Sequence, residues 1–158
     1  SWNPVLMPEV WDRTAADPLS PKYDFSGPHP DIVVVNLGQN DVGLPASQGR
    51  TLSTDFAQRY VAFIRGIRAV YPRSFIICAI GGMSAYRDSA ELRSAWEEAT
   101  GKLRKEDERV FDLRFEAFSC NHPRLPVHRA LAAELVSFIQ TEILDRFEVG
   151  RRRFELNT

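Results

Sequence analysis

An uninterrupted apolar run that ends in a polar turn constrains the fold of this chain most. The run from Ile32 to Val35 contains no polar residue, and the turn that soon follows, Gly38-Gln39-Asn40-Asp41, carries amide and carboxylate side chains. A strand without apolar–polar alternation is typical of the buried centre of a parallel sheet. We therefore expect the polar turn at the C-terminal edge of that sheet, where open α/β folds bind their ligands.

Strand and helix patterns alternate after this run. Further strands are predicted at Phe75–Ile80, closed by Gly81-Gly82, and at Val110–Leu113. Helices are predicted from a cap at Ser53 or Thr54 to about Tyr71, over Ala90–Lys105, and from Pro126 onward. The last helix carries an apolar stripe of Leu131, Leu135, Phe138, Ile139, Ile143 and Phe147. This alternation predicts βαβ units, a parallel sheet and right-handed crossovers.

The three predicted strands leave the most apolar one without a second neighbour. An uncovered apolar edge promotes aggregation, so we expect the strand at Ile32–Leu37 to have a further partner. Either residues 1–30 pair with it, or its partner strand lies outside this chain. We divide the chain into an irregular lead-in segment (1–30), an α/β part (31–147) and a polar tail (148–158).

Length and composition fit one domain with a substantial core. The chain has 158 residues, 44% of them hydrophobic, and a net charge of -1, which does not indicate a nucleic-acid partner. We interpret Arg151-Arg152-Arg153 as part of the tail. No apolar run is long enough for a membrane span, and no metal-ligand spacing or cofactor motif is found. We expect no metal, no cofactor and no membrane partner.

A loop with a histidine follows the third predicted strand. It runs from Ser119 to His128 and lies on the same side of the sheet as Asn40. His122 can act as a general base, since the pKa of an unperturbed imidazole is about 6.5; the alternative is a surface loop histidine. We interpret His128, in the first turn of the last helix, as structural and His29, between two prolines, as a loop residue.

Asn40 is a candidate oxyanion donor. A side-chain amide held in a turn can donate N–H groups to the developing negative charge of an acyl-transfer intermediate. The alternative is local turn chemistry, because Asn and Asp after Gly bond to their own backbone, and Asp41 fits that role better than Asn40 does.

These motifs resemble those of a known family. Gly38-Gln39-Asn40-Asp41 is similar to the Gly-x-Asn-Asp block of the SGNH (GDSL-like) hydrolases. The order of the other segments resembles the carbohydrate esterase family 2 branch, the acetylxylan esterase-like deacetylases. Those segments are Met7-Pro8-Glu9, Tyr23-Asp24-Phe25-Ser26, the run from Pro30 to Gly38, Tyr71-Pro72, Gly81-Gly82-Met83, and His122-Pro123 with His128.

The resemblance implies a flavodoxin-like three-layer α/β/α sandwich, the SGNH hydrolase fold. It implies that Asn40 is an oxyanion-hole donor and that His122 is the base which activates a serine. The family's serine lies in a Gly-Asp-Ser block after the first strand, and this chain contains no such block. We therefore expect an N-terminal fragment of the same domain, as an upstream segment or a companion chain, to supply the serine and the first strands. Secretion is expected from the resemblance.

The chain departs from the family pattern at one site position. Family members place an aspartate two residues before the histidine, where this chain has Cys120. Asn121 or a backbone carbonyl is the expected orienting group, which gives a Ser–His dyad. We do not interpret Cys120 as a nucleophile, since nothing in the sequence activates it. Ser84 lacks the nucleophile-elbow motif, so we interpret it as structural or substrate-contacting.

The leading hypothesis is a serine esterase that removes acetyl groups from carbohydrates. Gly38, Gln39, Val42 and the segment Ser84–Arg87 are expected to contact the acetylated substrate. Two alternatives remain open. One is a non-catalytic carbohydrate-binding or interaction domain derived from this fold, in which Trp2, Trp11 and Tyr23 stack on sugars. The other is a different SGNH activity, such as a lipase or thioesterase.

Overall fold

Helices and parallel strands alternate along the chain, as the sequence predicts. The computed structural model describes residues 5–42 and 51–144. The elements are α1 (Met7–Val10), β1 (Ile32–Asn36), α3 (Phe56–Val70), β2 (Phe75–Met83), α4 (Ser84–Asp88), α5 (Ala90–Glu106), β3 (Val110–Ser119), α6 (Leu125–Phe138) and a π-helical continuation of α6 (Ile139–Leu144). Residues 40–42 are also helical.

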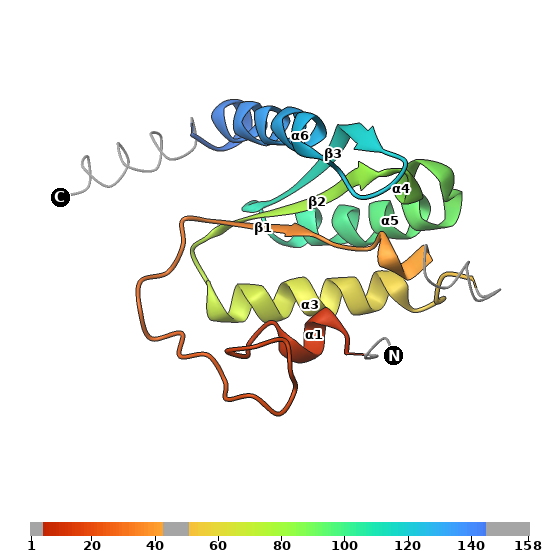
Figure 1. The fold of residues 1–158 in the computed structure, drawn as a ribbon. Helices are drawn as coiled ribbons and strands as arrows, with labels where there is room; N and C mark the ends of the chain where they lie inside the picture. Colours follow the sequence, from red (N-terminus) through yellow and green to blue (C-terminus); the bar gives the residue numbers. More distant parts are fainter. Residues whose placement is uncertain (1–4, 43–50, 145–158) are drawn as a thin grey trace.

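The three strands form one parallel sheet in the order β1-β2-β3 (Figure 1). β1 is paired with β2 through Ile32 opposite Phe75, and β2 with β3 through Ile76 opposite Val110. β2 is the central strand, and its first eight residues are buried. The predicted fold class, a parallel sheet between helical layers, is confirmed.

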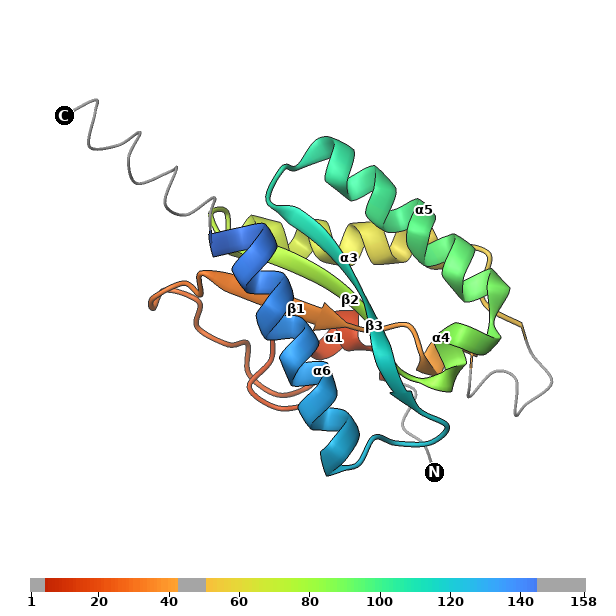
Figure 2. The ribbon, with the colours of Figure 1, turned by 90° about the horizontal axis from the view of Figure 1, so that it is seen from above.

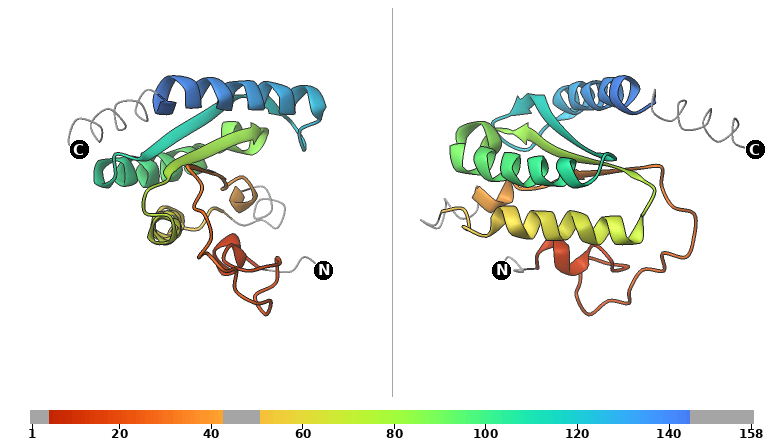
Figure 3. Two further views of the ribbon diagram at one scale, coloured as in Figure 1. Left: turned by 90° about the vertical axis from the view of Figure 1, so that its left-hand side faces the viewer. Right: turned by 180° about the vertical axis from the view of Figure 1, so that it is seen from behind.

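One face of the sheet is covered by α3 and α5 (Figure 3). α3 connects β1 to β2, and α5 connects β2 to β3. Both lie on the same face, as expected of right-handed crossovers that lead in one direction across the sheet. The apolar side chains of α3 and α5 recur at three- and four-residue steps, so each helix turns one stripe toward the sheet. The most deeply buried members of this layer are Ile64, Ile76, Cys78, Ile80, Leu92 and Trp96.

In the part of the chain that the structure describes, the other face is covered by α6 and its π-helical continuation. This helix packs mainly on β3 and over a smaller area on β2 (Figure 2). Leu131, Leu135 and Phe138 are only partly buried there, and Ile143 in the π-helical turn is the fully buried contact. Phe147, the last residue of the predicted stripe, lies outside the described residues.

β1 is an edge strand of the described sheet, which corrects the prediction that it is buried on both faces. Its Val35 is buried under α3, but Val34 points to the other face and is 41% exposed. Residues 5–30 do not pair with β1. They run along α3 instead (Figure 1), where Trp11 packs against Phe63 with ring centroids 6.0 Å apart.

Several predicted element ends shift. β2 continues through both glycines to Met83, and β3 extends to Ser119. α3 begins at Phe56 after Asp55, without a side-chain cap from Ser53 or Thr54; the Ser53 hydroxyl hydrogen-bonds to the Asp55 carboxylate instead. No helix in the described part of the chain is long and apolar enough to cross a membrane.

Candidate active site

The turn after β1 depends on a glycine. Gly38 has a φ of 115°, which side-chain-bearing residues rarely adopt. A Cβ at this position would also lie 3.2 Å from the Phe56 ring and 3.3 Å from Leu92. Gly38 is therefore required by the fold, and its predicted contact with substrate stays a prediction. The turn delivers residues 39–42 to the C-terminal edge of the sheet.

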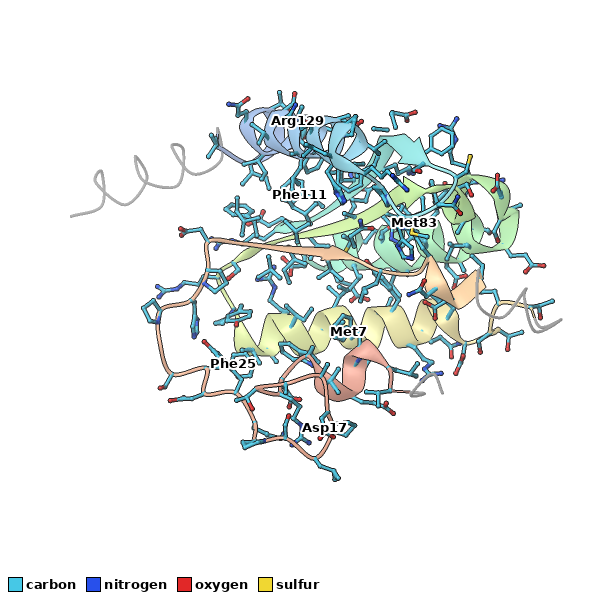
Figure 4. The ribbon with its side chains drawn as sticks, in the orientation of Figure 1. Met7, Asp17, Phe25, Met83, Phe111 and Arg129 are labelled. Atoms are coloured by element: carbon cyan, nitrogen blue, oxygen red, sulfur yellow. The ribbon has the colours of Figure 1, made fainter. Side chains whose placement is uncertain are left out.

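Gln39 ties this turn to the end of β2. Its side-chain Nε2 donates to the carbonyl oxygen of Gly81 at 2.7 Å, and its Oε1 accepts from the N–H of Met83 at 3.0 Å. Figure 4 labels Met83 at this end of β2. Both polar atoms of the Gln39 amide thus bond to the protein backbone, and its predicted contact with substrate stays a prediction.

Asn40 is exposed at the start of the short helical turn 40–42. Within the described residues, no hydrogen bond is recorded for its side-chain amide. The next residue, Asp41, donates its backbone N–H to the carbonyl of Gly38 at 3.1 Å, which closes a turn around Gln39 and Asn40. An amide without a partner among the described residues can donate to a ligand.

Asp41 faces a cavity on the α3 side of the turn. With Gly38 and Arg59 it lines a cavity of about 200 Å³ between the α1 region and α3. The residue as a whole is exposed, but its carboxyl group is partly enclosed by the cavity wall. This burial raises the pKa of the Asp41 carboxyl, and the Arg59 guanidinium opposes the shift. Asp41 is thus positioned on the α3 side of the turn.

His122 lies in the loop between β3 and α6. The loop residues Cys120, Asn121 and His122 are exposed, and the backbone N–H of Asn121 donates to the Ser119 hydroxyl at 3.4 Å. Among the residues that the structure describes, none hydrogen-bonds to the His122 imidazole. Neither Asn121 nor Cys120 holds the ring, so the predicted orienting group stays a prediction. His128 is exposed on α6.

Three of the predicted residues meet in one cleft. Val42 after β1, Ser84 after β2 and Cys120 after β3 line the same open cleft of about 670 Å³. Met83, Asp88, Ser89 and Glu91 contribute to the same wall. Val42 lies two residues after Asn40, and Cys120 lies two residues before His122. The cleft therefore joins the three βα loops that carry the candidate chemistry.

Two supporting contacts were not predicted from the sequence. The Glu134 carboxylate on α6 accepts from the backbone N–H groups of Glu116 and Ala117, at 2.8 and 2.9 Å, and so holds the end of β3. The Arg87 guanidinium lies 4.2 Å from the centre of the Phe118 ring. Apolar residues alternate with Arg114 and Glu116 along the end of β3, and this pattern could have extended the predicted strand.

No metal centre is formed by the described residues: nowhere in 5–42 and 51–144 do three His, Cys, Asp or Glu side chains gather at a common point. Cys78 is buried in the core, where burial raises the pKa of its thiol to about 12. Cys120 is an exposed thiol.

Comparison with known proteins shows which folds this chain is similar to. No family model matches the chain. One curated relative, the cellulase/esterase CelE of Acetivibrio thermocellus, is 27% identical over 130 residues, which are 77% of this chain and 16% of that protein.

The similar solved structures are family 2 carbohydrate esterases. A family 2 carbohydrate esterase from Clostridium thermocellum, solved with cellohexaose, has a TM-score of 0.74 and 24% identity over 90% of this chain and 45% of its own. A family 2 enzyme with a carbohydrate-binding domain from Corynascus thermopiles (Myceliophthora fergusii) has a TM-score of 0.69 and 24% identity, and covers 87% and 45%. An acetyl xylan esterase from Butyrivibrio proteoclasticus has a TM-score of 0.66 and 20% identity, and covers 86% and 45%.

The resemblance predicted from the sequence is confirmed as a likeness to these enzymes. The fold of this chain is the fold found in part of a family 2 carbohydrate esterase. The chain spans less than half the length of the solved chains and about a sixth of the curated relative.

Proposed function

We propose that this chain is part of a carbohydrate esterase, in which it supplies the oxyanion donor Asn40 and the base His122. The observation that supports the proposal is the cleft at the C-terminal edge of the sheet, where the loops after β1, β2 and β3 meet. Open α/β folds bind their ligands at this edge. The similarity to carbohydrate esterases selects ester hydrolysis among the reactions that such an edge supports.

The proposed reaction is removal of an O-acetyl group from a carbohydrate. A serine hydroxyl attacks the acetyl carbonyl, and His122 accepts the hydroxyl proton. The Asn40 amide donates to the oxyanion of the tetrahedral intermediate, together with backbone N–H groups. His122 then gives the proton to the leaving sugar oxygen, and water hydrolyses the acetyl-enzyme with His122 as base. Val42 and Ser84, on the cleft wall, contact the acetylated sugar.

An upstream segment of the same domain supplies the serine in this proposal. The open edge of β1 and the exposed Val34 beside it support a further strand at this position. Right-handed crossovers on the two faces of a sheet lead in opposite directions. A crossover whose helix lies on the α6 face therefore leads from such an added strand to a strand still farther from β2. The strand order then reverses next to β1, and the loop after the added strand emerges beside Asn40.

His122 functions in a dyad in this proposal. Cys120 occupies the position of the usual aspartate, and no described carboxylate bonds to the imidazole. A backbone carbonyl or the Asn121 side chain orients the ring when the domain is complete. A lipase or thioesterase remains an alternative within the same reaction class.

Non-catalytic carbohydrate binding is the second candidate function. One solved neighbour holds cellohexaose, and another, at a TM-score of 0.64, is described as displaying divergent catalytic and non-catalytic binding functions. Stacking by the lead-in segment is limited here, because Trp11 packs against Phe25 and Phe63. Tyr23 is 55% exposed, whereas Trp2 lies outside the described residues.

The proposal is tested by acetyl-ester hydrolysis with the chain joined to its upstream segment. We expect His122→Ala to lower kcat by roughly 100-fold or more, as loss of a general base does. The matched control is His128→Ala, an exposed histidine six residues away on α6. Full activity of the His122→Ala variant would show that the base is wrongly assigned. Sugar binding without hydrolysis by the unsubstituted protein would favour the second candidate.

A further inference from the structure

The ladder between β1 and β2 stops before the sheet ends. The two strands pair from Ile32 opposite Phe75 to Asn36 opposite Ala79, after which β1 turns away at Gly38. β2 continues to Met83 and remains paired with β3, across a register shift between Ile80 and Gly82. The end of β2 therefore has a neighbour on its β3 side, while backbone groups on its β1 side lose their strand partner.

The Gln39 amide takes the place of that partner. In a parallel ladder, a residue opposite Gly82 would donate to the carbonyl of Gly81 and accept from the N–H of Met83. The carboxamide of Gln39 makes both of these bonds, at 2.7 and 3.0 Å. One side chain thus reproduces the hydrogen bonds of one strand residue. The Asn36 amide makes only a longer contact with the Gly81 carbonyl, at 3.5 Å.

The glycines of β2 explain why its end needs the Gln39 side chain as a partner. Gly81 has a φ of 118°, and a Cβ there would lie 3.0 Å from the Cβ of Phe115, so the strand can follow this path only with glycine. The path carries β2 onward to Ser84, the first residue of α4 on the cleft wall. A partly buried carbonyl or N–H without a partner would destabilise this end.

We propose that Gln39 is a positioning residue that fixes Asn40 relative to the Ser84 wall of the cleft. Gln39 is adjacent to Asn40, and its amide is bonded to the residue immediately before Ser84. The two loops are thereby coupled through one side chain. Gln39 acts through Asn40 and does not contact the reacting atoms. The inference deepens the proposed esterase function and rests on it for its catalytic consequence.

Two substitutions test the Gln39 bridge. Gln39→Leu keeps the approximate size and removes both bonds. Gln39→Glu keeps the shape. One oxygen of its carboxylate still accepts from the Met83 N–H, but the other oxygen, also an acceptor, faces the Gly81 carbonyl oxygen and cannot donate to it. A protonated carboxyl restores the donor, so the neutral acid can make both bonds that the amide makes. We expect the folded chain to favour this neutral form.

The pH dependence of unfolding gives the first readout. The hydrogen bond to the Gly81 carbonyl raises the pKa of the introduced carboxyl in the folded chain above its unfolded value of about 4.3. At a pH below the pKa in the unfolded chain, the variant is then nearly as stable as the wild type. Its stability falls below that of the wild type as pH rises through the raised pKa in the folded chain. We expect the urea midpoint of Gln39→Glu to behave in this way, relative to wild type at each pH. Asp41 titrates in both proteins and cancels in the comparison.

Controls separate the bridge from a general charge effect. Gln58→Glu places the same change at an exposed position of α3, and its urea midpoint should follow the wild type at every pH. Gln39→Leu should show a lower midpoint without the pH dependence. A Gln39→Glu midpoint equal to wild type at neutral pH, or a deficit that does not change with pH, would contradict the bridge.

Catalysis gives the second readout, on the chain joined to its upstream segment. We expect Gln39→Leu to lower kcat by roughly tenfold or more with KM little changed, because small displacements of a catalytic group have large effects on rate. The ratio of Gln39→Glu activity to wild-type activity should rise as pH falls. Normal kcat in a variant with the unfolding signature would leave Gln39 purely structural and overturn the positioning role. Absence of esterase activity in the wild type would contradict the proposed function, while the unfolding readout would still test the bridge.

Discussion

The two faces of the sheet differ in how completely they are covered. On one face α3 and α5 together bury Ile64, Leu92 and Trp96 to 1% exposure or less. On the other face α6 has no fully buried residue, and Val34 of β1 is exposed beside it. The same sheet therefore has a finished core on one side and a half-covered surface on the other (Figure 3).

This difference indicates where the proposed upstream segment would pack. Leu125 and Val136 are 62% and 53% exposed on α6. Viewed down the helix axis, both lie on the side opposite to Glu134. Because Glu134 contacts β3, these two residues form a surface turned away from β3. Together with Val34 they provide apolar surface for a helix beside α6, while the finished face stabilises the turn at Gly38.

Leucine-to-alanine substitutions on the two faces should give the largest difference in unfolding free energy. We expect Leu92→Ala, on the finished face, to cost about 3 kcal/mol of unfolding free energy, since a fully buried leucine leaves a cavity. Leu135→Ala, on partly buried α6, should cost less than half of that, about 1 kcal/mol, because less apolar area leaves water on folding. Urea unfolding of the chain measures both. Equal costs would show that the α6 face is as well packed as the other.

A charge on the half-covered face should have opposite effects in two forms of the protein. In the chain alone, Val34→Lys exposes a charge at an apolar edge and should reduce self-association, measured by light scattering. In the chain joined to the proposed upstream segment, the same change should cost about 2 kcal/mol, because covering a lysine removes its charge from water. Leu19→Lys, on the 92% exposed Leu19 of the lead-in segment, is the control and should do neither. A neutral effect in the joined protein would mean that nothing covers Val34.

The sequence predicts most of the fold, because each element repeats one simple pattern. The unbroken apolar run at Ile32–Val35 correctly indicates a parallel strand, and the periodic apolar residues of α3 and α5 indicate helices on a common face. The same run overestimates the burial of β1. Its residues are suited to two neighbours and two covered faces, and the described chain provides one neighbour and one covered face at this strand.

Side-chain bridges are harder to predict than strands. Gly81 indicates a strand end, since glycine usually weakens strands, yet β2 continues through it, close to Phe115 of β3 and with its backbone bonded by Gln39. The extra residues of the register shift lie on β3. Nothing local to Gln39 indicates this role, because its partners lie more than 40 residues away and become available only after the register shift. Asn40 and His122 are found from sequence because each follows the end of a strand, and their roles stay predictions.

The smallest predicted effect concerns the anchor of α6 on β3. The Glu134 carboxylate accepts from two backbone N–H groups, and charged acceptors make stronger hydrogen bonds than neutral ones. Glu134→Gln keeps one acceptor and turns an amide donor toward the second N–H, so we expect a loss of about 1 kcal/mol. Glu142→Gln, on an exposed residue of the π-helical turn, is the matched control and should have little effect.

Hydrogen exchange locates this effect on the half-covered face. If Glu134 holds the end of β3, the amides of Glu116 and Ala117 should exchange faster in Glu134→Gln, while those of α3 and α5 keep their rates. The loop that carries His122 begins directly after this strand end, so its amides should also exchange faster. Uniform acceleration across both faces would mean that Glu134 contributes to global stability alone. Acceleration confined to β3 and the His122 loop would place the anchor of the candidate base on α6, the helix of the half-covered face.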